Sequence, residues 1–569
     1  MQGSPPCQAD SKIDIFRRFS NICAGLVLIG AAVGCRTEPL PKAARPDPPR
    51  ARVVTLIATA EVKGTTEPCG CTSDPLGDVA RVAKLAEGGL WIDAGSLLGD
   101  EVEARGGAKG QARRKGEALA AIVGAAKAAV GLGPGDLVLP GGAKEVAPPR
   151  LAVNVPPSAG VPLQAPEVRD VDGVKIGLFG VVAPERVKEL AGVGDPVAAA
   201  REAVAALRAK GAQVVVAVLG MSRREALPLV ESVEGIDVGV VGAEVGEGMI
   251  EAQEAVRASG KPSGWIVAPA DQGRRVARVD LHVVDGKPAM RMFGGEVARH
   301  RDLQRTETRR RQLALQLEEW RHDPTADPAF LKAREAELVE LKQREAQLAS
   351  EHPTPPAGSY FTYALEPIRR TLPRAPSVAE ALRALDRRIG KENLEEAQKV
   401  PPPTAEADRP RYVGVAACGK CHKAAVAQWK TTVHAHAWKT LVDVDKQYNY
   451  DCTGCHVTGF LKPGGSHLAS VEAKGLVDVQ CETCHGPGST HVAEAGLEEP
   501  RTMVRKPAPS LCADNCHTKD HSDTFQLEPY LRDLLGPGHG EKRRAELGAG
   551  VTAKELRARA VQDAKTAQH

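Results

Sequence analysis

Four clusters, each with two cysteines and a histidine, lie in the last quarter of the chain. Three have the spacing Cys-x-x-Cys-His, and the fourth carries one more residue between its cysteines. In such a motif the two thiols add to the vinyl groups of a haem, and the adjoining histidine becomes an axial ligand of the iron. The clusters are Cys418, Cys421 and His422; Cys452, Cys455 and His456; Cys481, Cys484 and His485; and Cys512, Cys516 and His517. We therefore predict three or four covalent haems c, the fourth with a stretched or incomplete attachment.

Zinc is the alternative to haem at these clusters, because paired cysteines with histidines also form tetrahedral zinc sites. A zinc site does not require a histidine directly after the second cysteine every time. The repetition of that histidine in all four clusters therefore favours haem.

Further histidines in the same region are candidates for the second axial position of each iron. Ten of the fifteen histidines lie between His422 and His539, whereas Met503 is the only methionine of the haem region. Two histidines per iron are therefore the expected ligation. The histidines outside the motifs are His434, His436, His467, His491, His521 and His539. We interpret His436 and His467 as surface residues and leave His521 open.

The amino terminus has the pattern of an export signal. Lys12, Arg17 and Arg18 precede an apolar stretch at residues 22–33, which is too short for a convincing membrane span. Small residues then lead to Cys35, which resembles the lipobox of bacterial lipoproteins. We expect residues 1–35 to be the signal and lipid on Cys35 to anchor the protein to a membrane on the periplasmic side. Simple cleavage and an uncut anchor are the alternatives.

Cys69 and Cys71 belong to neither the signal nor a haem motif. In an oxidising compartment they could pair with each other, although so short a loop strains the bridge. Two thiols packed in a turn are the equally favoured alternative.

The chain changes character at several points, and its length suits three or four domains. Short apolar runs alternate with alanine-rich helical stretches up to about residue 300, which predicts an α/β sheet buried on both faces. Leucines at helical spacing among many charges, interrupted by prolines, then predict a helical hairpin of coiled-coil type. The predicted order is a signal at 1–35, a linker at 36–50, an α/β domain at 51–300, a hairpin at 301–352, a strand and helix packing back on the first domain at 353–400, a linker at 401–410, a mainly helical and irregular haem module at 411–545 and a helical tail at 546–569.

The charge balance gives no case for nucleic-acid binding, since 75 basic and 72 acidic residues leave a net charge of only +3. We interpret the charges of the hairpin as solvated faces; a coiled coil that binds a partner is the alternative.

The first domain contains, in order, the segments AEVKGTTEPCGC, WIDAGS, VGLGPGDLVL, AVNV, VKIGLFGVVAP, GAQVVVAVLG and EGIDVGVVGAE. Their order resembles the calcineurin-like metallophosphatases and periplasmic 5'-nucleotidases. The resemblance implies an α/β sandwich and a centre of two metals, held by an Asp-x-His pair, a Gly-Asp, an Asn-His-Glu turn and two later histidines. The matching positions hold Glu61, Lys63, Ser96, Leu132, Gly133, Gly220 and Ala243.

These replacements remove nearly every ligand, and no histidine occurs before His282. A dinuclear phosphatase needs imidazoles and bridging carboxylates to hold its two ions. We therefore predict a pseudoenzyme that keeps the fold and a binding cleft. Glu61, Asp93 and Asp136 could form a weak oxygen-only site, but turn and N-cap carboxylates are the favoured interpretation. Asn154, which matches a family asparagine, is equally well a turn residue.

The haem module contains AACGKCH, QWKTTVHAHA, CTGCHVTGF followed by Gly464 and Gly465, VQCETCHGPGSTHV, LCADNCHT and a late GHG. These segments resemble the tetrahaem cytochromes of the c-554/c-552 type, which carry electrons from hydroxylamine oxidation in nitrifying bacteria. The resemblance implies that His434, His491 and His539 are distal ligands. The longer fourth motif and the additional histidines leave the fourth pairing open.

We therefore predict an exported multihaem cytochrome that relays electrons among redox protein partners in the periplasm or outer membrane, an electron carrier rather than an enzyme. Irons with two histidine ligands have no position for a substrate. The phosphatase-like domain would serve as a binding or positioning module. The alternatives are a multihaem oxidoreductase with one open haem acting on a small nitrogen compound, a phosphoesterase or nucleotidase with a redox appendage, and a scaffold centred on the hairpin.

Overall fold

The computed structural model describes residues 51–68, 70–100, 109–139, 142–145, 148–243, 246–284, 290–321, 323, 325–495, 503–518 and 521–566. These residues belong to one compact unit, Pro49–His569. The predicted signal, the lipidation site Cys35 and the thiol of Cys69 lie outside the described residues. None of the helices within the described ranges combines the length and the apolar character of a membrane span.

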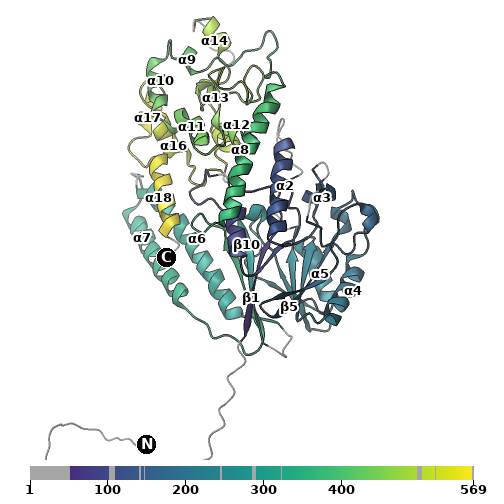
Figure 1. The fold of residues 1–569 in the computed structure, drawn as a ribbon. Coiled ribbons are helices and arrows are strands. Elements are labelled where there is room, and N and C mark those ends of the chain that lie inside the picture. Colours follow the sequence, from purple (N-terminus) through teal and green to yellow (C-terminus); the bar gives the residue numbers. More distant parts are fainter. Residues whose placement is uncertain are drawn as a thin grey trace, which may run out of the picture. The chain divides into compact units, whose positions relative to one another are not determined.

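Two six-stranded sheets form the first domain (Figure 1). One has the order β11-β12-β10-β1-β2-β3 and the other the order β4-β5-β6-β7-β9-β8. The strands of the first sheet are β1 (Arg52–Thr59), β2 (Leu90–Asp93), β3 (Ala129–Val130), β10 (Arg275–Val283), β11 (Arg291–Met292) and β12 (Tyr360–Pro367). Those of the second are β4 (Glu167–Val171), β5 (Val174–Val182), β6 (Val214–Gly220), β7 (Val238–Val241), β8 (Gln253–Val256) and β9 (Pro262–Val267).

The two sheets share a core, and helices cover their outer faces. Leu56 of β1 and Val216 of β6 lie in one buried cluster, as expected where two sheets face each other. Helices α4 (Pro196–Ala209) and α5 (Arg223–Ser232) bury their apolar sides on the second sheet. Helices α1 (Val79–Leu85), α2 (Lys109–Ala125) and α8 (Pro376–Gln398) cover the first. This arrangement confirms the predicted α/β sandwich.

A pair of long helices, α6 (Gly294–Arg321) and α7 (Pro328–Ser350), follows the sheets. Leu313, Leu317 and Leu348 are buried, and charged residues cover the outside. Helix α6 begins before the predicted boundary at residue 301, because Val297 already packs in the core of the first domain. The 3-10 helices, which are short, are η1 (Pro134–Asp136), η2 (Pro157–Ala159), η3 (Pro184–Arg186), η4 (Asp271–Gly273) and η5 (Val433–His436), and α3 (Gly142–Glu145) is a single turn.

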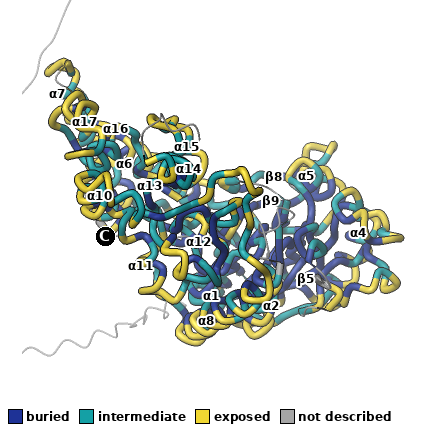
Figure 2. Tube along the Cα trace, turned by 90° about the horizontal axis from the view of Figure 1, so that it is seen from above, coloured by how far each residue is buried: buried dark blue, intermediate teal, exposed yellow. Residues whose placement is uncertain are grey.

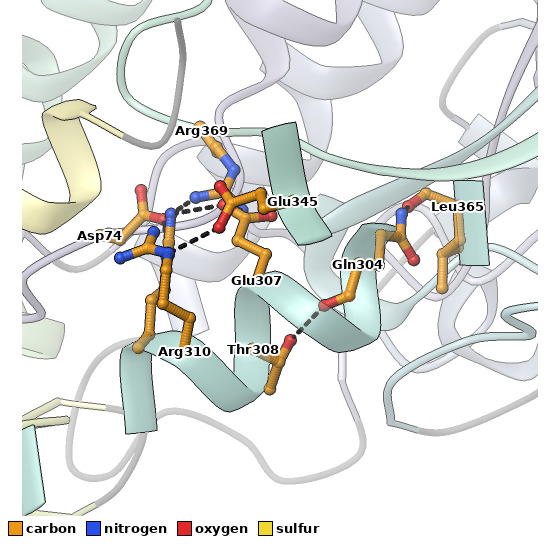
Figure 3. A network of polar contacts seen from close by, with 9 residues as sticks. Asp74, Gln304, Glu307, Thr308, Arg310, Glu345, Leu365 and Arg369 are labelled. Carbon is orange, nitrogen blue, oxygen red and sulfur yellow. Dashed lines mark hydrogen bonds and ion pairs between the residues drawn. The ribbon is translucent and has the colours of Figure 1, made fainter. Parts of the chain in front are cut away.

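A ring of ion pairs ties α6 to the first domain (Figure 3). Arg369, which follows β12, contacts Asp74 at 2.8 Å and Glu307 at 2.9 Å. Arg311 contacts the same two carboxylates at 3.0 and 2.9 Å. Because all four side chains are mostly shielded from water, the alternation of charges stabilises this junction more than an isolated surface pair would.

The haem module consists of short helices joined by irregular backbone. These are α9 (Val415–Cys418), α10 (Lys423–Lys430), α11 (Ala437–Val442), α12 (Tyr450–His456), α13 (Cys481–His485), α14 (Ser489–Ala493), α15 (Pro509–Asn515), α16 (Leu527–Leu534) and α17 (Glu541–Glu546), with α18 (Ala553–Thr566) after them. Val457, Val471 and Leu476 form a small buried cluster, whereas buried residues fill the sheets of the first domain (Figure 2). So small a core is consistent with cofactors that supply much of the apolar filling.

Candidate functional site

Each cysteine pair lies on or beside a short helix. In α12 and α13 the two cysteines and the histidine occupy positions i, i+3 and i+4, which share one face of a helical turn. The first motif forms the same kind of helical turn, because the amide of His422 donates to the carbonyl of Cys418 at 2.9 Å. In the fourth motif the amide of His517 reaches the carbonyl of Cys512 at 2.8 Å, one residue further back. A wider turn thus accommodates the additional residue.

Three pairs of histidine rings lie at nearly the same distance from each other. The ring centres are 6.2 Å apart for His422 and His491, 6.2 Å for His434 and His517, and 6.1 Å for His485 and His539. An imidazole nitrogen binds a metal at about 2.0 Å, and the ring centre lies about 1.1 Å behind it, so two imidazoles on opposite sides of one ion have centres about 6 Å apart. The spacing therefore fits an iron between each pair. Each of the three predicted distal histidines faces a motif histidine.

Hydrogen bonds fix the ring orientation of two motif histidines. The Nδ1 atom of His456 donates to the carbonyl of Ala437 at 2.7 Å, and that of His485 donates to the carbonyl of Val504 at 2.6 Å. Because a carbonyl can only accept, each Nδ1 carries the proton and Nε2 keeps its lone pair for a metal.

The remaining histidines differ from one another in their surroundings. His436 is exposed, as predicted, and His521 is also exposed. The prediction of a surface position for His467 is wrong: its side chain is buried, because its Nε2 contacts the carbonyl of Val400 at 2.8 Å. In the described part of the chain, no histidine ring faces His456 in the way that the three pairs do. A second histidine ring therefore lies beside the motif histidine at three of the motifs, and ligation of each iron by two histidines stays a prediction.

Contacts between thiols show which motifs are neighbours. The side chains of Cys418 and Cys481 are close enough to interact, which brings the first motif beside the third. The side chains of Cys516 and Cys455 are also close enough to interact, and the Cys455 thiol donates to the carbonyl of Asn515 at 3.7 Å. The second motif is therefore beside the fourth, and groups attached to these cysteines would be closely spaced.

In the first domain, Asp136 has a structural role. Its carboxylate, which is fully buried, accepts hydrogen bonds from the amides of Ser96 at 2.9 Å, Leu97 at 3.0 Å, Leu98 at 3.3 Å and Gly133 at 3.0 Å. The equally buried guanidinium of Arg150 lies 3.6 Å away and supplies the opposite charge. The burial of Arg150 could not be predicted from sequence, because a single arginine beside an apolar run carries no signal of its burial.

The other two acidic candidates also have partners within the domain. Asp93 accepts from the hydroxyl of Thr59 at 2.7 Å and the amide of Gly95 at 3.1 Å, and burial raises the pKa of its carboxyl to about 7. Glu61 lies 3.3 Å from the ammonium group of Lys63, and burial raises the pKa of this glutamate as well.

Asn154 bonds the backbone of Val182 in both directions, at 2.8 and 3.0 Å, and donates to the carbonyl of Gly194 at 3.1 Å. Its amide is thereby engaged in joining three segments. Across the described ranges, no three His, Cys, Asp or Glu side chains are grouped as metal ligands would be.

Comparison with known proteins agrees with the geometry of the carboxyl-terminal module. Residues 417–486 match the family described as cytochrome c554 and c-prime. Over 97 residues the chain is 40% identical to cytochrome c-554 of Nitrosomonas europaea, a match that covers 14% of this chain and 40% of that protein. The chain thus spans less than half the length of this curated relative. The module is thus similar to c-type cytochromes, whose cofactor is covalent haem c.

Solved structures similar to the chain include nucleotidases and a phosphoesterase, the class that the landmarks of the first domain resemble. The 5'-nucleotidase precursor from Thermus thermophilus is 16% identical, with 64% of this chain and 61% of that chain covered and a TM-score of 0.39. The NAD nucleotidase of Haemophilus influenzae is 18% identical, with coverages of 42% and 48% and a TM-score of 0.33. A calcineurin-like phosphoesterase from Bacillus subtilis is 17% identical, with coverages of 42% and 87% and a TM-score of 0.32.

Proposed function

We propose that the protein is an exported multihaem c-type cytochrome that carries electrons between redox protein partners on the periplasmic side of a membrane, to which lipid on Cys35 anchors it. The first domain serves as a binding or positioning module without catalytic activity. The observation that carries the proposal is the set of three histidine pairs with ring centres 6.1 to 6.2 Å apart, each containing one motif histidine.

The residues of the chain fit haem in two respects. The cysteine pairs of the four motifs would hold the porphyrins through thioether bonds, and the paired histidines would occupy both axial positions at three of them. Bound haem supplies one-electron oxidation and reduction at its iron. The protein's own residues would orient the imidazoles, as the carbonyl of Val504 does for His485, and at the three paired motifs would leave no ligand position for a substrate.

The second motif supports a second candidate function, an oxidoreductase acting on a small nitrogen compound. His456 faces no other histidine ring in the described part of the chain, whereas the other three motif histidines do. Its Nδ1 is engaged by Ala437, so that only Nε2 is available to an iron. An open position there would give a high-spin signal in the oxidised protein and a spectral change on addition of nitric oxide. Neither would be observed in a carrier whose irons all have two protein ligands.

The ligand assignment can be tested with two histidine variants of protein matured in a haem-competent host. Replacing His491 with alanine removes one member of a pair, so the oxidised protein should gain a high-spin signal for one additional haem. The matched control is His436→Ala, which alters an exposed histidine outside the pairs and should leave the spectrum unchanged. If His491→Ala leaves the spectrum of the parent protein unaltered, the proposed ligation is wrong.

A further inference from the structure

The attachment helix α12 lies against the first domain through a buried set of amide side chains. Gln111 of α2 is 1% exposed, Asn393 of α8 is 0% exposed, and Asn449, which caps the amino end of α12, is 5% exposed. Burial of three amides is costly unless each polar atom has a partner. Their mutual bonding therefore decides whether they stabilise the contact.

The amides form a continuous chain of hydrogen bonds from the first domain to α12. Asn393 Nδ2 donates to Gln111 Oε1 at 2.7 Å, and Gln111 Nε2 donates to Asn449 Oδ1 at 2.9 Å. Gln111 Oε1 also accepts from the amide of Tyr450 at 3.1 Å, and Arg114 donates to Asn393 Oδ1 at 2.6 Å. A buried network of linked amides of this kind restricts the relative orientation of its members.

The same asparagine also starts the attachment helix. Asn449 Oδ1 accepts from the amide of Asp451 at 2.9 Å, and its carbonyl accepts from the hydroxyl of Thr453 at 2.7 Å. One side-chain oxygen is therefore shared between the N-cap of α12 and Gln111 of the other domain. Any rotation of α12 relative to α2 must break one of these bonds, and α12 carries Cys452, Cys455 and His456.

Ion pairs surround the amide network. Lys446, shortly before α12, lies 2.8 Å from Glu67 and 3.4 Å from Asp386 of α8. Lys115 of α2 pairs with Asp451 in the first turn of α12. These contacts add charged links between the α12 region and the first domain.

We propose that Gln111, Asn393 and Asn449 are positioning residues for the second haem centre, so that the first domain sets the orientation of His456 and with it the potential of that centre. This inference rests on the proposed function. It gives the phosphatase-like domain a purpose that requires no metal and no substrate, since its helices α2 and α8 supply the surface that holds α12.

The test uses the full chain, matured with haem, and two positions in the network. Gln111→Ala cuts the link between domains and leaves the N-cap of α12 intact, whereas Asn449→Ala removes both. Each should shift the midpoint potential of the second centre, with the other potentials unchanged. Each should also accelerate amide hydrogen exchange in α12 about tenfold or more, because buried hydrogen bonds are lost. Asn449→Asp keeps an oxygen at the shared position and should restore most of both properties.

The control is Lys391→Ala, which alters a 77% exposed side chain on the same helix as Asn393. The inference is overturned if Gln111→Ala changes neither the potential nor the exchange, or if it shifts all the potentials equally. Mass spectrometry of the parent protein separates the two proposals. Absence of haem from the second motif would contradict the proposed function, whereas a haem that is present but indifferent to Gln111 would contradict only this inference.

Discussion

Replacing Asp136 with asparagine should destabilise the first domain by about 5 kcal/mol or more. The carboxylate accepts four backbone amides, two on each oxygen. An asparagine side chain retains one oxygen, so two buried N–H groups lose their acceptor at a cost of about 1–3 kcal/mol each. Arg150, fully buried, also loses its negative partner, which costs about 3–5 kcal/mol when a buried pair is broken. The sum approaches the whole stability of an average domain, about 5–15 kcal/mol.

Urea unfolding followed by far-ultraviolet circular dichroism measures this loss. Glu185→Gln is the matched control, because that carboxylate is 80% exposed and pairs with Lys188 only at the surface, so its loss should cost less than about 0.5 kcal/mol. A loss below about 1 kcal/mol for Asp136→Asn would refute the assigned role of the carboxylate. Specific stabilisation of the unsubstituted protein by manganese, abolished by the substitution, would instead identify Asp136 as a metal ligand.

Three further predictions concern the first domain and the hairpin. Burial raises the pKa of Asp93 to about 7 from an unfolded value near 3.9, so the charged carboxylate penalises folding above pH 7. Lowering the pH from 8 to 5 should therefore increase the free energy of unfolding of the unsubstituted protein by about 3 kcal/mol. Asp93→Asn should remove that gain, as measured by thermal unfolding at the two pH values. With manganese added, a chromogenic phosphodiester should not be hydrolysed; turnover that Glu61→Gln abolishes would contradict the pseudoenzyme interpretation. Asp74→Ala should leave Arg311 and Arg369 without one shared partner and accelerate hydrogen exchange in α6, whereas unchanged exchange would show that the ion-pair ring does not hold the hairpin.

The attachment motifs could be predicted because covalent haem chemistry fixes their spacing along the chain. Cys418, Cys421 and His422 are recognisable without any tertiary information. The partner of each motif histidine is a different matter, since His434 faces His517 across a long stretch of sequence. Family resemblance predicts that His434 is a ligand, but only the fold shows that it lies beside the histidine of the fourth motif.

The strands of the first domain could also be predicted, because β5 and β6 are continuous apolar runs buried on both faces. The burial of polar residues could not. Arg150 is buried because Asp136, from another segment of the chain, supplies the opposite charge. Gln111 contacts Asn393 only once α2 and α8 have packed together. Each of these residues is of a type that usually lies at the surface. The partner that makes its burial favourable is brought to it only by the tertiary fold.

The most direct test of the account is the intact mass of protein matured in a haem-competent host, read together with its visible spectrum. We expect a red protein whose mass exceeds that of the processed chain by three or four haems, with the acyl groups of a lipidated amino terminus. A colourless product from a host with working maturation machinery, with the mass of the bare polypeptide, would contradict the central claim that the cysteine clusters bind haem.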